Sequence, residues 1–461
     1  MLFSSLEFLY LFLPLTLGAY YLCPSRGRNA LLLVFSLLFY CLGGLSSLPL
    51  ILLTVALSFF FGLRIGSLRK KGRLGRLPLI LGIVSVLSLL CFFKYYDLLA
   101  RTVGLPLLSL PLPVGISFYS FQAVSYLIDV YRGEPEQRSP VDFGTYVTLF
   151  PQLIAGPIVR YEELRDQLGH RPLRWNQIAS GIGVFSVGLA KKVLFANPAG
   201  ELGEGLLEGI GGNTVLRAWL WLILFSLQIY FDFSGYSDMA VGLGRLFGFE
   251  LPVNFRYPYV SQSITDFWRR WHITLSAWFR QYLYFPLGGN RRGRWRTYRN
   301  LLLVWALTGL WHGASWNFLG WGLYFFLLLS LEKAFLGRLL SRLPRPLRHL
   351  YALLGILLGW WIFSAEGDWS VHLPRLLALF GVGAVGVADE WIRYELLRSL
   401  PLLLLMVVGA TPLPKHLWSR LTVRRPVLGY ALPLVLCPLG LLLCTAYLVD
   451  SGYNPFLYFR F

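Results

Sequence analysis

The sequence predicts an all-α, polytopic membrane protein. Hydrophobic residues make up 56% of its 461 residues and charged residues only 14%, a balance outside the range of soluble domains. Long runs carry no aspartate, glutamate, lysine or arginine, and a membrane-spanning helix needs about 20 such apolar residues. Basic residues cluster between these runs, where they orient membrane proteins. Together these observations place the chain in a lipid bilayer.

The charge-free runs define the expected spans. They cover residues 29–63, 77–93, 218–231, 301–331 and 426–449. The apolar run 4–22 has no basic residues before it and no small-residue cleavage site after it, so we expect a first span and not a removable signal peptide. At about 20 residues per crossing, the chain has room for about ten to twelve spans. Without a linker long enough to separate domains, we expect a single integral membrane domain, 1–461.

Basic clusters mark the cytoplasmic side of the membrane. They lie at residues 25–28, 69–76, 160–174, 290–299, 338–348 and 415–425. By this rule the N-terminus and the tail, 450–461, lie outside, and Lys191 and Lys192 fit the map poorly because they approach its outer side. Counting 371–388 as a span would force the basic loop 415–425 outside. We therefore expect 371–388 to be an external interfacial or re-entrant segment.

The composition also excludes several classes of partner. A net charge of +19 would suggest nucleic acid in a soluble chain, but these basic residues lie between spans, so membrane lipid is the expected partner and nucleic acid is not. The five cysteines include neither a C-x-x-C pair nor a Cys/His cluster, so we expect no disulfide and no metal site. The stretch VGLGRLFG is similar to a nucleotide loop, but no strand precedes it. Helix packing through Gly244 and Gly248 is the favoured interpretation.

Other apolar pieces, such as 105–121 and 146–159, are too short or too interrupted by proline and glycine to cross. Such backbone is stable at membrane depth only where protein or a water-filled cavity satisfies its polar groups. The fold is therefore expected to enclose a cavity.

One imidazole, His312, stands in the stretch LTGLWHGASWNFLGWGLYFFLLL, which has three tryptophans and no charged residue. Twelve residues from the basic loop, at about 1.5 Å each, place it about 18 Å into a core about 30 Å thick. An ionisable residue at that depth indicates a cavity, a relay or a site; the alternative is a satisfied structural histidine. Desolvation disfavours the imidazolium, so we expect a neutral ring that can take a proton.

The neighbours of this histidine suggest its setting. In a continuous helix, Thr308 lies one turn before it and Ser315 or Trp316 one turn after, so a hydroxyl can orient the ring. Gly313 and Ala314 leave room for a narrow substrate.

Two carboxylates, Asp232 and Asp238, follow another charge-free run in FDFSGYSDM. Either can orient His312 or line the cavity, and helix capping by Asp232 or Ser234 is the alternative. The residues expected to line the cavity are Trp311, Trp316, Asn317, Thr308, Asp232 and Asp238.

Residues 261–289 are expected to form an interfacial helix with an aromatic face and a charged face, on which Asp266 and Arg270 have i,i+4 spacing. At about 100° per residue, His272 falls on the shoulder of the aromatic face, beside Trp268. This histidine is either functional or an ordinary interfacial residue.

At these motifs the chain resembles the membrane-bound O-acyltransferase family. The motifs are TGLWHGASWNFLGWGLY, FDFSGYSDMAVGLGRLFGF, NFRYPY, SITDFWRRWHITLSAWFRQYLYFPLGGNR, FPQLIAGPIVRYEEL and the tail SGYNPFLYFRF. The likeness is densest at 113–165 and 228–333, and its pattern is nearest to the alginate O-acetylating branch. It implies a ring of tilted helices around a central funnel, with re-entrant and interfacial helices. A catalytic histidine at the base matches His312, and a second functional histidine matches His272. Phe325 stands where relatives often carry a histidine.

The resemblance implies an O-acetyltransferase of the bacterial cell membrane. It would take an acetyl group from a cytoplasmic thioester, acetyl-CoA or an acyl carrier, and pass it across the membrane to an exported or cell-wall polysaccharide. No bound cofactor is implied, and the partner is a periplasmic or extracellular acetyltransferase- or esterase-like enzyme. His312 would be the general base, and His272 would position or polarise the donor. Arg291, Arg292 and Arg294 attract an anionic donor or serve only to fix topology.

Two other functions stay open at this stage. One is a proton-coupled transporter with His312 as a relay, although the chain shows no inverted repeat. The other is a non-catalytic subunit of a polysaccharide secretion complex.

Overall fold

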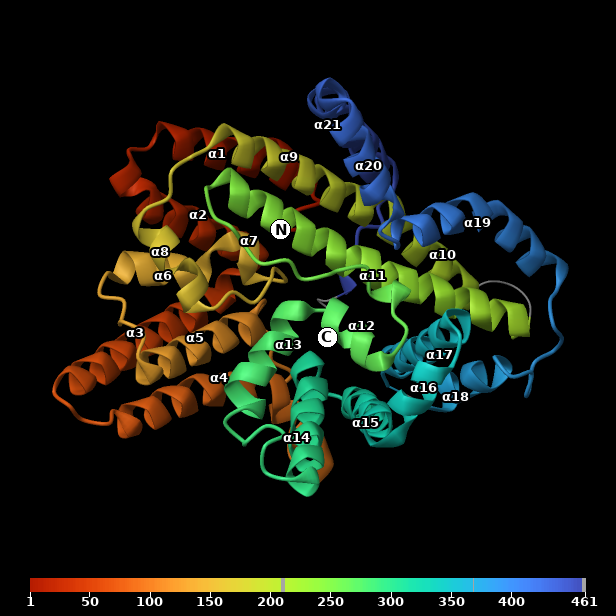
Figure 1. The fold of residues 1–461 in the computed structure, drawn as a ribbon, viewed down its shortest axis with the longest axis horizontal. Helices are drawn as coiled ribbons and strands as arrows, with labels where there is room; N and C mark the ends of the chain where they lie inside the picture. The colour runs from red at the N-terminus through yellow and green to blue at the C-terminus, as the bar shows by residue number, and fades with distance from the viewer. Residues whose placement is uncertain (209–211, 368, 458–461) are drawn as a thin grey trace. The chain divides into compact units, whose positions relative to one another are not determined.

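The computed structural model describes residues 1–208, 212–367 and 369–457, and the regular elements of these residues are all helices (Figure 1). Six helical stretches among them are long and apolar enough to cross a membrane, or seven if the bent pair α19 (Glu390–Gly409) and α20 (Leu413–Arg424) counts as one span. The six are Leu45–Lys70, Arg76–Val103, Trp175–Leu207, Val215–Leu246, Arg345–Ser364 and Pro426–Asp450. The prediction of an all-helical membrane protein is confirmed, whereas the described residues supply six or seven candidate spans and not the ten to twelve expected.

One compact unit contains Met1–Gly188, Tyr236–Val253 and Ala277–Tyr282. Its complete helices are η1 (Phe8–Phe12), α1 (Leu13–Leu22), η2 (Ser25–Gly27), α2 (Arg28–Gly43), η3 (Leu45–Ser47), α3 (Leu48–Lys70), α4 (Arg76–Val103), α5 (Ile116–Arg132), α6 (Pro140–Thr148), α7 (Phe150–Leu153) and α8 (Tyr161–Gly169), and α9 (Trp175–Ala190) begins here. Local signals set several helix ends. Gly104, in the left-handed conformation, ends α4, and the Ser139 hydroxyl accepts from the Asp142 N–H to cap α6.

In this unit the VGLGRLFG stretch packs helices together. A Cβ atom on Gly242 would lie 2.6 Å from the Phe185 nitrogen and 2.7 Å from the Gly181 oxygen, so α9 approaches α11 (Val215–Leu246) backbone to backbone. The expected packing through Gly244 and Gly248 is wrong, because Gly248 already lies beyond the helix at φ +82°; the close contact between helices is made at Gly242.

The second unit contains Leu189–Gly235, Asn254–Ser276 and the described residues after Tyr282. Its helices are η4 (Lys191–Ala196), α10 (Asn197–Glu208), η5 (Pro258–Val260), α12 (Ile264–Arg270), α14 (Arg294–His312), α15 (Trp316–Leu331), η7 (Glu332–Leu336), α16 (Gly337–Arg342), α17 (Arg345–Ser364), α18 (Trp369–Ala378), α19, α20 and α21 (Pro426–Asp450). Four helical elements, α9, α11, α13 (Ile273–Phe279) and η6 (Arg280–Tyr284), contribute residues to both units.

An aromatic core lies between helices of the second unit. The Trp268 ring centroid is 4.6 Å from that of Trp305, 5.5 Å from that of Trp321 and 5.0 Å from that of Phe325. Phe325 is fully buried and is part of this apolar core.

The continuous interfacial helix expected over 261–289 is wrong. The chain breaks between α12 and α13, where His272 has a φ of 44°. The break arises because the next two N–H groups do not bond back into α12; Ile273 N and Thr274 N donate to the backbone and side-chain oxygens of Asn254. The expected i,i+4 pair is present, with Asp266 and Arg270 joined at 2.9 Å.

One other expected span is divided in two, and the segment 371–388, which was not expected to cross, contains only a short helix. Residues 301–331 form two helices, α14 and α15, because the chain becomes extended at Gly313. Glycines let these helices pack closely, since a Cβ atom on Gly309 would lie 2.2 Å from the Phe318 oxygen and one on Gly322 2.3 Å from the Trp305 oxygen. In segment 371–388, α18 ends at Ala378 and is only 10 residues long, too short to cross.

Candidate active site

His312 is the last residue of α14, so its ring stands at a break in the chain and not within a continuous span. The residue is 5% exposed. Its ring centroid lies 5.0 Å from that of Trp311, 5.0 Å from that of Trp321 and 5.4 Å from that of Phe363. These aromatic contacts hold the imidazole in one orientation and shield it from water.

A cavity of about 20 Å³ lies beside His312. Its lining residues are Ile229, Asp232, Phe233, Trp271, His312, Trp360, Phe363 and Leu457. This volume holds about one water molecule, so a thioester substrate enters only if side chains move. Among the residues expected to line a cavity with His312, Asp232 does so.

Two other predicted residues contact side chains or backbone of residues that line this cavity. Trp311 packs against both histidines, with its ring centroid 5.0 Å from that of His312 and 5.9 Å from that of His272. Asn317 donates from Nδ2 to the backbone oxygen of Phe363 at 3.0 Å and so holds a lining residue in place.

The predicted surroundings on the helix itself are only partly correct. The Thr308 hydroxyl donates to the Val304 oxygen at 2.7 Å, within its own helix. Because α14 ends at His312, Trp316 starts the next helix and is 59% exposed, so the shared helical face was a wrong expectation. Gly313 does not make room for substrate either, since a Cβ atom there would lie 2.1 Å from the Phe318 ring.

His272 is fully buried and so is not exposed to water. Its ring centroid lies 4.8 Å from that of Phe233, edge to face, and Nδ1 lies 3.2 Å from Oδ1 of Asn254. Burial lowers the pKa of the His272 imidazole to about 3, so the ring is neutral at physiological pH. The backbone has the left-handed conformation, which is uncommon for a residue other than glycine and is often found at functional sites.

A buried ion pair forms part of the cavity wall. Lys192 Nζ lies 2.7 Å from Asp232 Oδ1, and the two side chains are 2% and 3% exposed. The C-terminal tail completes this arrangement, because Leu457 N donates to Asp232 Oδ2 at 2.8 Å and Lys192 donates to the Pro455 oxygen. The tail thus contributes Leu457 to the same cavity that His312 lines. Sequence reasoning missed this role of Lys192, whose poor fit to the charge map was the available signal.

The remaining predicted residues lie elsewhere. Asp238 is half-buried on α11 and belongs to the first unit, whereas the cavity residues belong to the second. Arg291, Arg292 and Arg294 are exposed at the start of α14 and in the turn before it, as a donor-binding loop or a topological signal requires.

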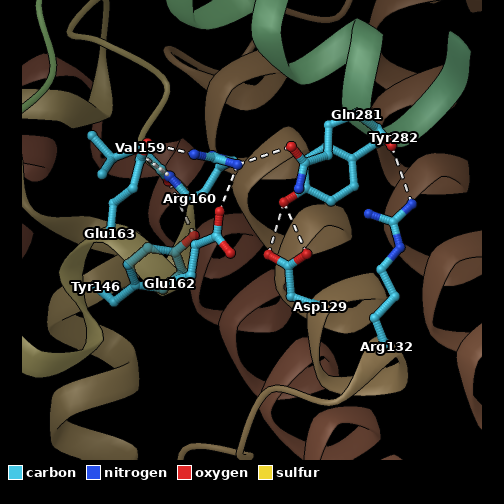
Figure 2. A network of polar contacts seen from close by, with 9 residues as sticks. All are labelled: Asp129, Arg132, Tyr146, Val159, Arg160, Glu162, Glu163, Gln281 and Tyr282. Carbon is cyan, nitrogen blue, oxygen red and sulfur yellow. Dashed lines mark hydrogen bonds and ion pairs between the residues drawn. The ribbon is translucent and has the colours of Figure 1, made fainter. Parts of the chain in front are cut away.

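Figure 2 shows a polar network in the first unit that the sequence did not predict. The Tyr282 hydroxyl contacts both carboxylate oxygens of Asp129, at 2.9 and 2.8 Å. Gln281 accepts from Arg132 through its backbone oxygen at 3.1 Å and from Arg160 through Oε1 at 3.0 Å. Three side chains of α5 and the segment before α8 therefore hold η6, which follows the helix after His272.

Fold and site together define a helical membrane protein with a buried imidazole beside a small cavity. The family model described as MBOAT, membrane-bound O-acyltransferase family, matches residues 79–367. The chain is 43% identical to "Probable alginate O-acetylase AlgI" of Azotobacter vinelandii, over 84% of this chain and 80% of the relative. It is 38% identical to the protein of the same name from Pseudomonas putida, over the whole length of both. A "Peptidoglycan O-acetyltransferase" of Helicobacter pylori is 35% identical, over 85% of this chain and 82% of the relative.

The chain therefore belongs to the membrane-bound O-acyltransferase family, and it is an acyltransferase. The resemblance found in its motifs is confirmed.

Proposed function

We propose that this acyltransferase takes an acetyl group from a cytoplasmic thioester and passes it across the membrane to an exported or cell-wall polysaccharide. The observation that carries the proposal is the placement of His312, a buried imidazole at a helix end that faces a cavity. The names of the relatives, which refer to alginate and peptidoglycan O-acetylation, support a polysaccharide acceptor.

In this proposal His312 is the general base. Its neutral ring takes the proton of an acceptor hydroxyl while the hydroxyl oxygen attacks the thioester carbonyl carbon. The carbon–sulfur bond then breaks, and the departing thiolate takes the proton from the imidazolium, which leaves an ester, a free thiol and the original neutral ring. The aromatic walls formed by Trp360 and Phe363 align the reactants and keep out water, which would hydrolyse the thioester.

The donor is acetyl-CoA or an acetylated acyl carrier, used as a substrate and not as a resident cofactor. Both donors are anionic, and the exposed Arg291, Arg292 and Arg294 supply positive charge for a first encounter. His272 positions or polarises this donor. Trp311 packs against the rings of both His272 and His312 and so links the two histidines.

We place the protein in the cell membrane of a bacterium, as a single domain with a ring of tilted helices around a funnel and His312 at its base. A periplasmic or extracellular acetyltransferase- or esterase-like partner would receive the acetyl group for the polysaccharide. Membership of an acyltransferase family favours this function over a transporter or a non-catalytic secretion subunit.

The test is release of free thiol from acetyl-CoA by the purified protein, together with surface-polymer acetylation in a deletion strain carrying each variant. His312→Ala should lower the rate by about 10²–10⁴ with the protein still present in the membrane. His349→Ala is the matched control, because His349 is a half-buried histidine in the same unit that bonds to the Ser261 oxygen and does not line the cavity. Activity of His312→Ala within a factor of a few of wild type would contradict the assignment of His312 as the general base.

A further inference from the structure

Asn254 holds the segment that carries His272. Its Oδ1 atom lies 3.2 Å from His272 Nδ1, 3.2 Å from the backbone nitrogen of Thr274 and 2.9 Å from the Thr274 hydroxyl oxygen. Its backbone oxygen accepts from Ile273 N at 3.0 Å. Asn254 is 2% exposed and His272 is fully buried, so water does not compete for these bonds.

These contacts determine which nitrogen of His272 carries the proton. The backbone N–H of Thr274 is a donor only, so the Asn254 atom that faces it must be the amide oxygen and not the amide nitrogen. The same oxygen faces His272 Nδ1, which therefore has to be an N–H group. A neutral ring with a proton on Nδ1 carries its lone pair on Nε2. Among the described residues, this buried Nε2 atom has no hydrogen-bond partner.

We propose that Asn254 is a positioning residue that fixes His272 as the Nδ1–H tautomer, so that Nε2 accepts a hydrogen bond from an N–H or O–H group of the acyl donor. This inference rests on the proposed function, because it assigns the second histidine a task in binding the thioester. The amide N–H groups of the pantetheine arm, which coenzyme A and acyl carriers share, have the required chemistry.

The tautomer decides between the two roles considered for His272. A lone pair cannot donate a hydrogen bond to a carbonyl oxygen, so Nε2 cannot polarise the thioester carbonyl. Positioning the donor is the role that an acceptor nitrogen can fill. The left-handed backbone at His272, held by the bonds from residues 273 and 274 to Asn254, keeps the ring in this orientation.

The direct test is the nitrogen spectrum of the full-length protein in detergent, labelled with ¹⁵N and ¹³C at histidine. The chain has six histidines, and the difference from a His272→Gln sample identifies the signals of His272. We expect a protonated Nδ1 and an unprotonated Nε2 at pH 7, with Nε2 shifting toward the hydrogen-bonded range when coenzyme A is added. A proton on Nε2 in the wild-type protein would overturn the proposal without any variant having to fold.

Variants then connect the tautomer to the reaction. In Asn254→Leu, His272 should no longer be held as the Nδ1–H tautomer. The kcat should fall about 10–100-fold, the usual effect of losing a partner that orients a functional histidine. Asn254→Asp keeps an acceptor oxygen at this position and should retain the Nδ1–H tautomer and most of the rate. Because a carboxylate also keeps the two bonds to Thr274, the readout that separates positioning of His272 from a purely structural role is the nitrogen spectrum and not the rate. An unchanged tautomer in Asn254→Leu would contradict the proposal.

Asn300→Leu is the control for damage to the fold. Asn300 is also a fully buried asparagine of the second unit, with Nδ2 donating to the oxygens of Leu287 and Gly289, but it does not contact His272. Its loss should lower stability and leave the His272 signals in place. The proposed function fails separately, if the His312→Ala variant still transfers acetyl groups. The tautomer of His272 in the nitrogen spectrum does not depend on that result.

Discussion

Replacement of Lys192 by methionine should leave a carboxylate without its counter-charge inside the protein. Lys192 Nζ and Asp232 Oδ1 are 2.7 Å apart and both side chains are nearly inaccessible to water. At an effective dielectric constant of about 20, two charges at this separation attract by about 6 kcal/mol, and most of that energy offsets their desolvation. Removing one partner therefore costs about 3–5 kcal/mol in the free energy of unfolding, because the remaining charge is buried alone.

The pair can be measured with a double-mutant cycle. Lys192→Met and Asp232→Asn are compared with the double variant, in which the introduced amide still offers an acceptor oxygen to Leu457 N. Unfolding is followed in detergent by tryptophan fluorescence during denaturant titration. Each single variant should be destabilised by about 3–5 kcal/mol, and the double variant should return to within about 1–2 kcal/mol of wild type.

Additive losses, with the double variant weaker than either single one, would refute the reasoning, since uncoupled residues do not rescue one another. Activity gives a second readout. Asp232 and Leu457 both line the cavity beside His312, so a single variant that loosens the tail should slow acetyl transfer as well as lower stability.

Three further predictions concern charge, pH and topology. Alanine substitutions in the loop 291–294 should raise the donor KM at low salt, and the difference should shrink as salt screens charges beyond about 10 Å at 0.1 M; an unchanged KM would make these arginines purely topological. The pKa of His272 is lowered to about 3 from 6.5, so between these values the unfolded chain binds more protons, and stability should fall by about 1.4 kcal/mol per pH unit as pH drops through that window. His272→Gln should flatten that slope. In a cysteine-free protein, an impermeant thiol reagent should label a cysteine at Ser451 from outside and one at Ser341 only after permeabilisation, and the reverse pattern would invert the topology.

Much of the fold could be predicted because charge-free runs and basic clusters follow from the bilayer itself. The runs 77–93 and 426–449 correspond to α4 and α21, two candidate spans. Where expected helices were wrong, a contact from a distant residue had overridden the local pattern. The aromatic and charged periodicity around His272 favours one continuous helix, and Asn254, 18 residues before His272, breaks that helix by accepting from the next two N–H groups.

The candidate site, like the fold, could be predicted only in part from the sequence. The depth of His312 is a prediction from its distance to the basic loop. The sequence did not predict the end of α14 at that residue, where the chain becomes extended at Gly313 and α14 packs closely on α15 at Gly309 and Gly322. Such packing depends on which backbone atoms face the glycines, and the order of residues does not show it. For this reason the neighbours expected from helical spacing, Thr308 and Trp316, do not surround the ring as expected.

Lys192 shows how a conflict within the sequence can point to a site. The charge bias places basic residues on the cytoplasmic side, and a lysine near the outer end of an apolar helix contradicts it. The structure resolves the conflict, because Lys192 is buried against Asp232 and bound to the tail at Pro455. Its charge is compensated inside the protein and so carries no weight in orienting the chain. The other basic clusters agree on one topology. Of the two lysines that disagree with it, Lys192 is one partner of a buried ion pair, and the other partner, Asp232, directly follows the apolar run 218–231.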